Sequence, residues 1–141
     1  MAKPDARAVL RVLDVNLNRG REGLRVLEDT ARFVWEAPAL FRPLRDLRHE
    51  MDLIARSAYP RLVAARDSRT DMGRMIPETK RRDWKGLVIA NFRRAEESLR
   101  VLEEYGKMVS PVAAPKFKVL RYRLYSVEKA AARKLKNDQR A

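Results

Sequence analysis

The stretch NLNRGREGLRVLEDTARFV, residues 16–34, decides the fold because it recurs at residues 91–109 as NFRRAEESLRVLEEYGKMV. Nine of the nineteen aligned positions are identical at an offset of 75 residues, and most of the others are conservative changes. A second, shorter repeat follows, because Leu47-Arg48-His49 matches Leu120-Arg121-Tyr122. Self-similarity of this kind marks a repeated structural unit. Each half of the chain is therefore predicted to form one helical hairpin.

The apolar residues of the repeat follow the period of an α-helix. They recur at spacings of three and four, a pattern that buries one face against a neighbouring helix, and in the first copy they are Leu17, Gly20, Leu24, Leu27, Ala31 and Val34. The rest of the chain has few glycines and no run of alternating apolar and polar residues. These features predict an all-α fold: a four-helix bundle made of two duplicated hairpins with pseudo-two-fold symmetry.

The chain of 141 residues is long enough for one domain with its own core. We expect a single helical domain over residues 1–141, with repeat halves at about 10–60 and 84–136. Prolines suggest where the second helix lies, with Pro43 in its first turn and Pro60 at its end. Residues 61–82 break every periodicity and are predicted to form a loop, and loops of this length are often functional.

The charge of the chain points to an anionic partner. Lys and Arg number 32 against 19 Asp and Glu, giving a formal net charge of +13. Nucleic acid and phosphorylated small molecules both fit such a balance. The absence of cysteine and the single histidine exclude thiolate and multi-histidine zinc sites. The N-terminus lacks the apolar run of a signal peptide, so a cytoplasmic protein without a membrane partner is expected.

Four polar side chains near the starts of the two repeat helices form the first candidate site: Asn16, Arg19, Asn91 and Arg94. If both helices point the same way, these side chains meet at one end of the bundle, where helix dipoles add positive potential. The sequence then predicts a convergent anion site. The alternative is that they cap helices and form local ion pairs that were kept since the duplication.

The loop provides the second candidate site. Arg66, Arg69 and Arg74 lie close in sequence to Asp71, beside the permissive backbone of Gly73. As a site, Asp71 would bind a metal or accept a proton while the arginines grip phosphate oxygens. As a plain loop, the same residues are only solvated. His49 lies between Arg48 and Glu50, and it either packs against the core or joins the phosphate site.

Two further polar patterns are interpreted as structural. A stripe of alternating charge on the first repeat helix is typical of a solvated face, and it consists of Asn18, Glu22, Arg25, Asp29 and Arg32. Four repeated glutamates, Glu22, Glu28, Glu97 and Glu103, resemble the ligands of metal-binding bundles, but no Glu-x-x-His occurs and arginines lie between them. The sequence also lacks a P-loop and a dinucleotide-binding glycine motif, so any nucleotide site is of another kind.

The paired motifs resemble a known family. N-x-N-R-G-x-E-x-L-R-V-L-E-D at 16–29, LRH at 47–49, D-x-G at 71–73, ANFRRAEESLRVLEEY at 90–105 and LRYRLY at 120–125 are similar to the helical hydroxymethylpyrimidine-phosphate kinase domain of thiamine biosynthesis. That domain is often fused upstream of thiamine-phosphate synthase. The resemblance covers about 10–130, nearly the whole chain.

The resemblance implies an ATP-dependent kinase that converts hydroxymethylpyrimidine phosphate to its pyrophosphate. It implies Mg²⁺ as cofactor, ATP as co-substrate and thiamine-phosphate synthase as a partner. We assign Asp71, Arg94 and Arg19 as catalytic residues, with Asp71 as the metal ligand. The assigned phosphate and substrate ligands are Asn16, Asn91, Arg66, Arg69, Arg74 and His49.

The alternative function is a non-catalytic basic helical module that binds nucleic acid or acts as a regulatory scaffold. In that case the basic residues should form a continuous outer stripe, and binding should weaken steeply with salt. In the kinase they should converge on one cleft with Asp71. Bundles of this size with wide apolar flanks often dimerise, so the sequence leaves a homodimer open.

Overall fold

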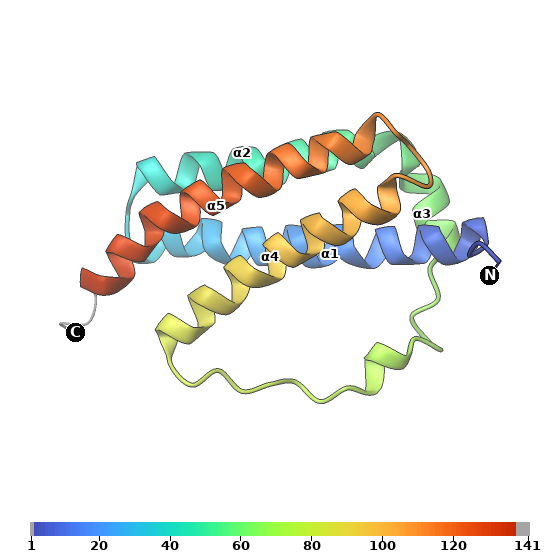
Figure 1. The fold of residues 1–141 in the computed structure, drawn as a ribbon. Coiled ribbons are helices and arrows are strands. Elements are labelled where there is room, and N and C mark those ends of the chain that lie inside the picture. The colour runs from blue at the N-terminus through green and yellow to red at the C-terminus, as the bar shows by residue number, and fades with distance from the viewer. Residues whose placement is uncertain (1, 138–141) are drawn as a thin grey trace.

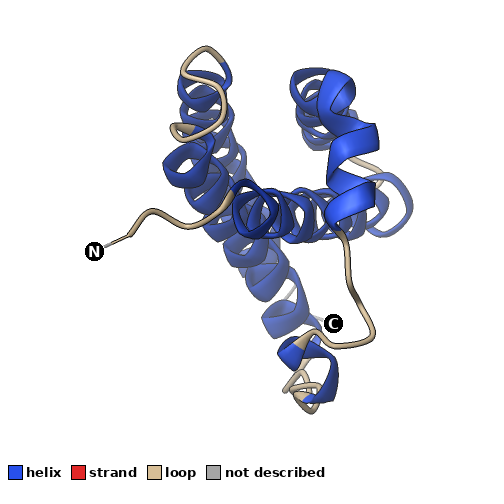
Figure 2. Ribbon diagram, turned by 90° about the vertical axis from the view of Figure 1, so that its right-hand side faces the viewer, coloured by secondary structure: helices blue, strands red, loops and turns tan. Residues whose placement is uncertain are grey.

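The computed structural model describes residues 2–137 (Figures 1 and 2). In that range, α-helices and short helical turns follow one another along the chain. The helices are α1 (Ala6–Asp29), α2 (Pro38–Ala55), α3 (Tyr59–Ala65), α4 (Trp84–Gly106) and α5 (Ala113–Asn137). No strand occurs among the described residues, so the all-helical prediction is confirmed. None of these helices is long and apolar enough to cross a membrane.

Aspartate caps begin both long repeat helices. Asp5 Oδ1 accepts the backbone N–H of Ala8 at 2.7 Å before α1, and Asp83 Oδ1 accepts that of Gly86 at 2.7 Å before α4. Each carboxylate satisfies an N–H group that has no partner inside the helix. After a π-helical turn over Thr30–Val34, the chain reverses at Glu36, whose φ of 48° is left-handed.

Two predicted boundaries are wrong. The second helix begins at Pro38 and not at Pro43, because the earlier start also buries Leu40. Pro60 does not end a helical region but lies in the first turn of α3, where its missing N–H is tolerated. α3 forms because Leu62 and Ala65, three positions apart, are both buried. The segment between the hairpins is therefore 66–83, with a 3-10 turn over Met72–Met75.

The helices pack as two antiparallel pairs. α2 returns along α1 and α5 returns along α4, while α1 lies across α4 and runs in the opposite direction (Figure 1). Two glycines allow this close crossing. A Cβ on Gly20 would lie 2.7 Å from Ser98 Oγ, and one on Gly23 would lie 3.1 Å from the carbonyl oxygen of Asn91. The two repeat helices therefore do not point the same way, which was the condition for the predicted convergent anion site, and the pseudo-two-fold bundle stays a prediction.

A buried ion pair joins the helices of each pair. Arg48 on α2 donates to both oxygens of Glu28 on α1, with Nε–Oε2 at 2.6 Å and Nη2–Oε1 at 3.1 Å. Arg121 on α5 donates from Nη2 to Glu103 Oε2 on α4 at 2.9 Å. Burial raises the pKa of Glu28, but the hydrogen bond and charge of Arg48 and the charges of nearby basic groups leave it below its ordinary value. Glu28 and Glu103 are thus structural, as the sequence suggested.

Another buried carboxyl group, Glu96 on α4, faces an acid instead of an arginine. Glu96 is 8% exposed, and its Oε2 has no hydrogen-bond partner among the described residues. Burial, followed by the charge of Glu128 on α5 and a hydrogen bond to it, raises the pKa of Glu96 from 4.5 to about 8. Glu97 adds to the shift and Arg93 opposes it. The pair therefore holds a proton at neutral pH.

We expect Glu96 to make the protein less stable in alkali, and Glu96→Gln to remove that loss. The folded protein keeps the proton up to about pH 8, whereas the unfolded chain releases it near 4.5. The stabilising contribution is therefore complete below the unfolded pKa and is lost as the pH rises through the folded pKa. A Gln side chain donates to Glu128 at every pH, so Glu96→Gln should raise the free energy of unfolding at about pH 9 by about 1–2 kcal/mol.

Urea unfolding at about pH 5 and about pH 9 measures this effect, with Glu97→Gln as the control because Glu97 is an exposed neighbour on the same helix. Glu96→Gln should match the wild type in acid and exceed it in alkali, while the control should deviate from the wild type only slightly, because Glu97 contributes least to the raised pKa of Glu96. An equal difference at both pH values would contradict the assignment.

Candidate functional site

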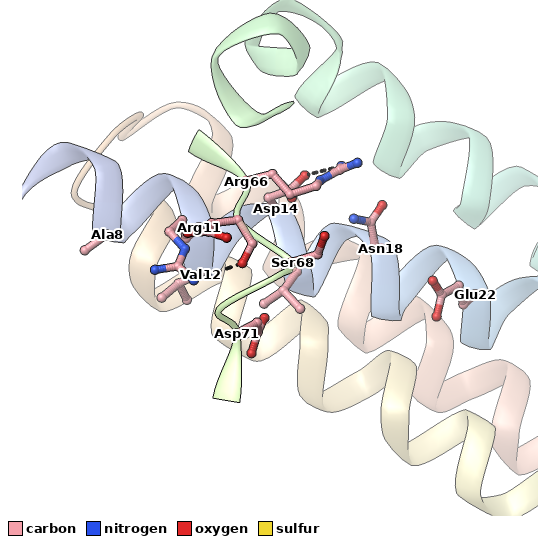
Figure 3. A pocket seen from close by; sticks show the side chains of 11 residues that line it. Ala8, Arg11, Val12, Asp14, Asn18, Glu22, Arg66, Ser68 and Asp71 are labelled. Carbon is pink, nitrogen blue, oxygen red and sulfur yellow. Dashed lines mark hydrogen bonds and ion pairs between the residues drawn. The ribbon is translucent and has the colours of Figure 1, made fainter. Parts of the chain in front are cut away.

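A groove lies along α1, where the chain that leaves α3 passes over it (Figure 3). We call it the α1 groove; it encloses about 470 Å³. Its lining residues come from α1 and from residues 66–71, and they are Ala8, Arg11, Val12, Asp14, Val15, Asn18, Glu22, Arg66, Asp67, Ser68 and Asp71. Most of the polar ones are charged, which makes the groove a candidate site for an ionic ligand.

A bidentate ion pair between Asp14 and Arg66 fixes the centre of the groove. Arg66 donates from Nε to Oδ2 at 2.7 Å and from Nη2 to Oδ1 at 2.8 Å, which attaches the end of α3 to α1. The Asp14 side chain is 10% exposed, whereas that of Arg66 is 44% exposed. The hydrogen bonds and charge of Asp14 raise the pKa of Arg66. Arg66 is thus oriented while its outer N–H groups still face the groove.

The segment after Arg66 is held in a tight turn. Asp67 accepts hydrogen bonds from the backbone N–H of Thr70 at 3.2 Å and from its hydroxyl at 2.7 Å. These bonds, followed by the charges of nearby arginines, lower the pKa of Asp67. Asp71 Oδ1 accepts the N–H of Gly73 at 2.7 Å. These local bonds fix the Asp71 carboxylate at the groove, although every side chain of the turn is close to solvent.

The groove continues along α1 toward α2. A cavity of about 390 Å³ shares Asp14, Asn18 and Arg66 with it, and a further cavity of about 360 Å³ shares Asn18 and Glu22. The second of these also contains three arginines, Arg21, Arg25 and Arg48. The three cavities therefore form one polar strip in which arginines follow one another along α1.

Two carboxylates of the groove are free to bind a cation. Within residues 2–137, neither Glu22 nor Asp71 forms an ion pair. Residues 2–137 contain no cluster of three His, Asp or Glu side chains that could hold a metal. Mg²⁺ commonly needs only one or two carboxylates when phosphates and water complete its shell. Asp71 by itself can serve that mode of binding, because Glu22 lies farther along α1 and away from it (Figure 3).

The structure places Arg66 and Asp71 in the groove, as predicted, but not the paired asparagines. Asn16 and Asn91 are buried, and each donates from Nδ2 to a carbonyl four residues earlier, Val12 at 2.9 Å and Leu87 at 2.8 Å. The backbone of Asn91 lies against Gly23, which is about 10 Å along α1 from Asn16. The two asparagines therefore bond carbonyl groups of their own helices, and neither of them caps a helix, since the caps are Asp5 and Asp83.

The other predicted ligands also lie outside the groove. All five are exposed and none lines the α1 groove or its continuation: Arg19, Arg94, Arg69, Arg74 and His49. None of the cavities described here is lined by any of the four asparagine and arginine side chains, which lie well inside α1 and α4, near the crossing of the two helices, and not at the helix starts where the anion site was predicted. The charge of His49 contributes to the lowered pKa of Glu28.

Three residues of the groove were missed or misread. Asp14, Asn18 and Glu22 recur every four residues on α1 and share one face. The predicted solvated stripe is exposed at Glu22, Arg25 and Arg32, but its Asn18 and Glu22 also line the groove. This second role could not be predicted, because the bond that places residues 66–71 beside α1 joins residues 52 positions apart. The four-residue spacing was the signal available in the sequence.

Comparison with known proteins agrees with the resemblance that the motifs suggested. A family model described as the ThiD2 family matches residues 11–130. The chain belongs to this family. It is 42% identical over 131 residues to the thiamine-phosphate synthase of Synechocystis sp., which covers 91% of this chain and 37% of the relative.

Other relatives give the same result. The thiamine-phosphate synthase of Rhodopirellula baltica is 36% identical over 131 residues, covering 89% of this chain and 35% of the relative. That of Nostoc punctiforme is 42% identical over 123 residues, covering 85% and 34%. The chain thus spans about a third of the length of these relatives, which are enzymes of thiamine biosynthesis by name. No solved structure matches the chain.

Proposed function

We propose that this member of the ThiD2 family is a phosphotransferase that converts hydroxymethylpyrimidine phosphate to its pyrophosphate with ATP. Membership of the family and the names of the relatives support a role in thiamine biosynthesis. The α1 groove carries the proposal, because it combines an oriented arginine, further arginines along α1 and two carboxylates without ion-pair partners. This composition suits two phosphate-bearing substrates and a divalent cation.

The reaction needs charge neutralisation more than it needs a base. An oxygen of the pyrimidine phosphate attacks the γ-phosphorus of ATP, a new P–O bond forms, and the bond from that phosphorus to the β-bridging oxygen breaks to release ADP. Since a phosphate monoester has a second pKa of about 6, its oxygens are already ionised at neutral pH. Asp71 is therefore proposed as a cation ligand and not as a proton acceptor.

Each group of the groove has a role in this proposal. Arg66, held by Asp14, binds phosphate oxygens, and the arginines farther along α1 bind the remaining charge. Asp71 is the proposed ligand of Mg²⁺, which would neutralise phosphate charge when bound. A thiamine-phosphate synthase, the activity by which the relatives are named, is the proposed partner that consumes the product.

Direct incubation with ATP, Mg²⁺ and hydroxymethylpyrimidine phosphate tests the function, with the pyrophosphate and ADP detected by mass spectrometry. The wild type should form both products in equal amounts. Asp71→Asn should lower kcat/KM by about 100-fold, because it removes the carboxylate proposed for Mg²⁺, and higher Mg²⁺ should restore part of the loss. Glu78→Gln is the matched control, since Glu78 is exposed in the same connecting segment and does not line the groove.

Two outcomes would count against the proposal. If no product forms with both ATP and Mg²⁺ present, the proposed kinase activity is contradicted. If Asp71→Asn and Glu78→Gln turn over equally, the α1 groove is contradicted as the catalytic site. Tight binding of duplex DNA that weakens steeply with salt, without turnover, would favour the nucleic-acid module.

A further inference from the structure

A further cavity lies between α4 and α5. It is the counterpart, in the second repeat, of the cavity of about 390 Å³ that continues the α1 groove in the first repeat. Six positions of the first cavity are Asp14, Leu17, Asp52, Ala55, Arg56 and Leu62. The repeat offsets, 75 residues for α1 and 73 for the following helices, convert them to Ile89, Phe92, Tyr125, Glu128, Lys129 and Leu135. All six converted positions line the second cavity, which encloses about 500 Å³. The duplication has therefore produced two equivalent cavities.

The second cavity has different chemistry from the first. Ile89 replaces Asp14, Phe92 replaces Leu17 and Tyr125 replaces Asp52, so an apolar and aromatic surface stands where the first cavity has carboxylates. Three lysines complete the wall: Lys85, Lys129 and Lys136. A flat ring can pack on such a surface, and the lysines can bind an anionic group beside it.

The acid pair of α4 and α5 opens onto this cavity. Glu128 lines it, and Glu96 lies against Glu128. Glu96 is more than nine-tenths buried, and its Oε2 has no hydrogen-bond partner among residues 2–137. The other charged groups that act on Glu96 are Arg93 and Glu97. Glu96 itself does not line the cavity, so Glu128 is the carboxylate of the pair that a ligand can reach, and it can accept hydrogen bonds from the N–H groups of a ligand.

We propose that this cavity is a second ligand site, which binds an amino-substituted heteroaromatic ring carrying a phosphate. The ring packs on Ile89 and Tyr125, its amino group donates to Glu128, and the phosphate lies against Lys129. The α1 groove lies beside α3, whereas the second cavity lies toward the end of α5, at the opposite end of the molecule (Figure 1). The site is therefore separate from the proposed catalytic groove.

Two sources share this ligand chemistry, an adenine nucleotide and an aminopyrimidine phosphate. We therefore use AMP and hydroxymethylpyrimidine phosphate as probes, each titrated alone into the full chain with backbone amides followed by NMR. The amides of Ile89, Tyr125 and Lys129 should shift in a saturable way with at least one probe. The responding probe identifies the source.

Variants locate the site. Glu128→Ala and Lys129→Glu should each weaken binding about tenfold or more, because one removes the acceptor and the other reverses the charge at the phosphate. Lys134→Glu is the matched control, since Lys134 is exposed on the same helix and does not line the cavity, and it should bind like the wild type. Arg66→Ala should also bind normally, which separates this test from that of the kinase.

Other results would overturn the proposal. They are the absence of saturable shifts with both probes, shifts confined to the α1 groove, and equal weakening by Lys129→Glu and Lys134→Glu. The last result would show attraction to the general positive charge of α5 and no defined site.

Discussion

Arg48→Ala is expected to lower the free energy of unfolding by about 3–5 kcal/mol, because it leaves a buried charge without its partner. Glu28 is 3% exposed and receives two hydrogen bonds from Arg48, at 2.6 and 3.1 Å. Arg25 remains nearby, but it lies 3.7 Å from Glu28 and its side chain is 55% exposed. Urea unfolding at neutral pH measures the loss.

Arg25→Ala is the matched control for this prediction, and it should cost no more than about 0.5 kcal/mol, as exposed helix pairs do. Since the pKa of Glu28 lies below its ordinary value, the contribution of the ion pair is complete above the unfolded pKa and is lost as the pH falls through the folded pKa. The deficit of Arg48→Ala should therefore shrink in acid. A deficit no larger than that of Arg25→Ala would show that the pair is not a main stabilising contact.

The apolar pattern predicted the helices because burial follows helical periodicity directly. Leu24 and Leu27, taken from the repeat, are 0% and 1% exposed. The equivalence of Arg48 with Arg121 was also visible as the second, shorter repeat in the sequence, and both arginines hold the glutamates of the neighbouring helix. The burial of residues spaced by the helical period, and the pairing of residues that face each other in one hairpin, depend only on local geometry. They can therefore be predicted from the sequence.

The relative direction of the two hairpins could not be predicted in the same way. A period of three and four residues fixes which face of a helix is buried, but it is the same for parallel and antiparallel partners. The direction here depends on the close approach of α1 and α4, with Gly20 beside Ser98 and Gly23 beside Asn91. The glycines were visible in the sequence, but their partners on the other helix were not.

The candidate site was predicted in part, from its loop. Arg66 and Asp71 were chosen because arginines and aspartates gather around Gly73, and both line the groove. Asp14 was missed because nothing near it in sequence shows that Arg66 will bond it. A long-range bond of this kind depends on where α3 docks, and α3 was itself hidden in a segment predicted to be a loop.

Arg66→Ala is expected to lower kcat/KM for the proposed phosphoryl transfer by about 100-fold or more, since it removes an oriented donor to phosphate charge. Arg66→Lys should recover little of the loss, because an ammonium group cannot reproduce the two parallel bonds to Asp14 at 2.7 and 2.8 Å. Steady-state kinetics with both substrates varied gives kcat and KM separately.

Asp14→Asn distinguishes direct binding by Arg66 from a merely structural role. Asp14 acts as a positioning residue, so its loss should leave Arg66 charged but poorly oriented and should raise KM for the pyrimidine phosphate more than it lowers kcat. Arg42→Ala is the control, because Arg42 is exposed on α2 and lines none of the cavities of the groove. If Arg66→Ala and Arg42→Ala have equal kcat/KM while both remain folded by circular dichroism, the α1 groove is not where the phosphates bind, and the reaction must be sought elsewhere on the chain.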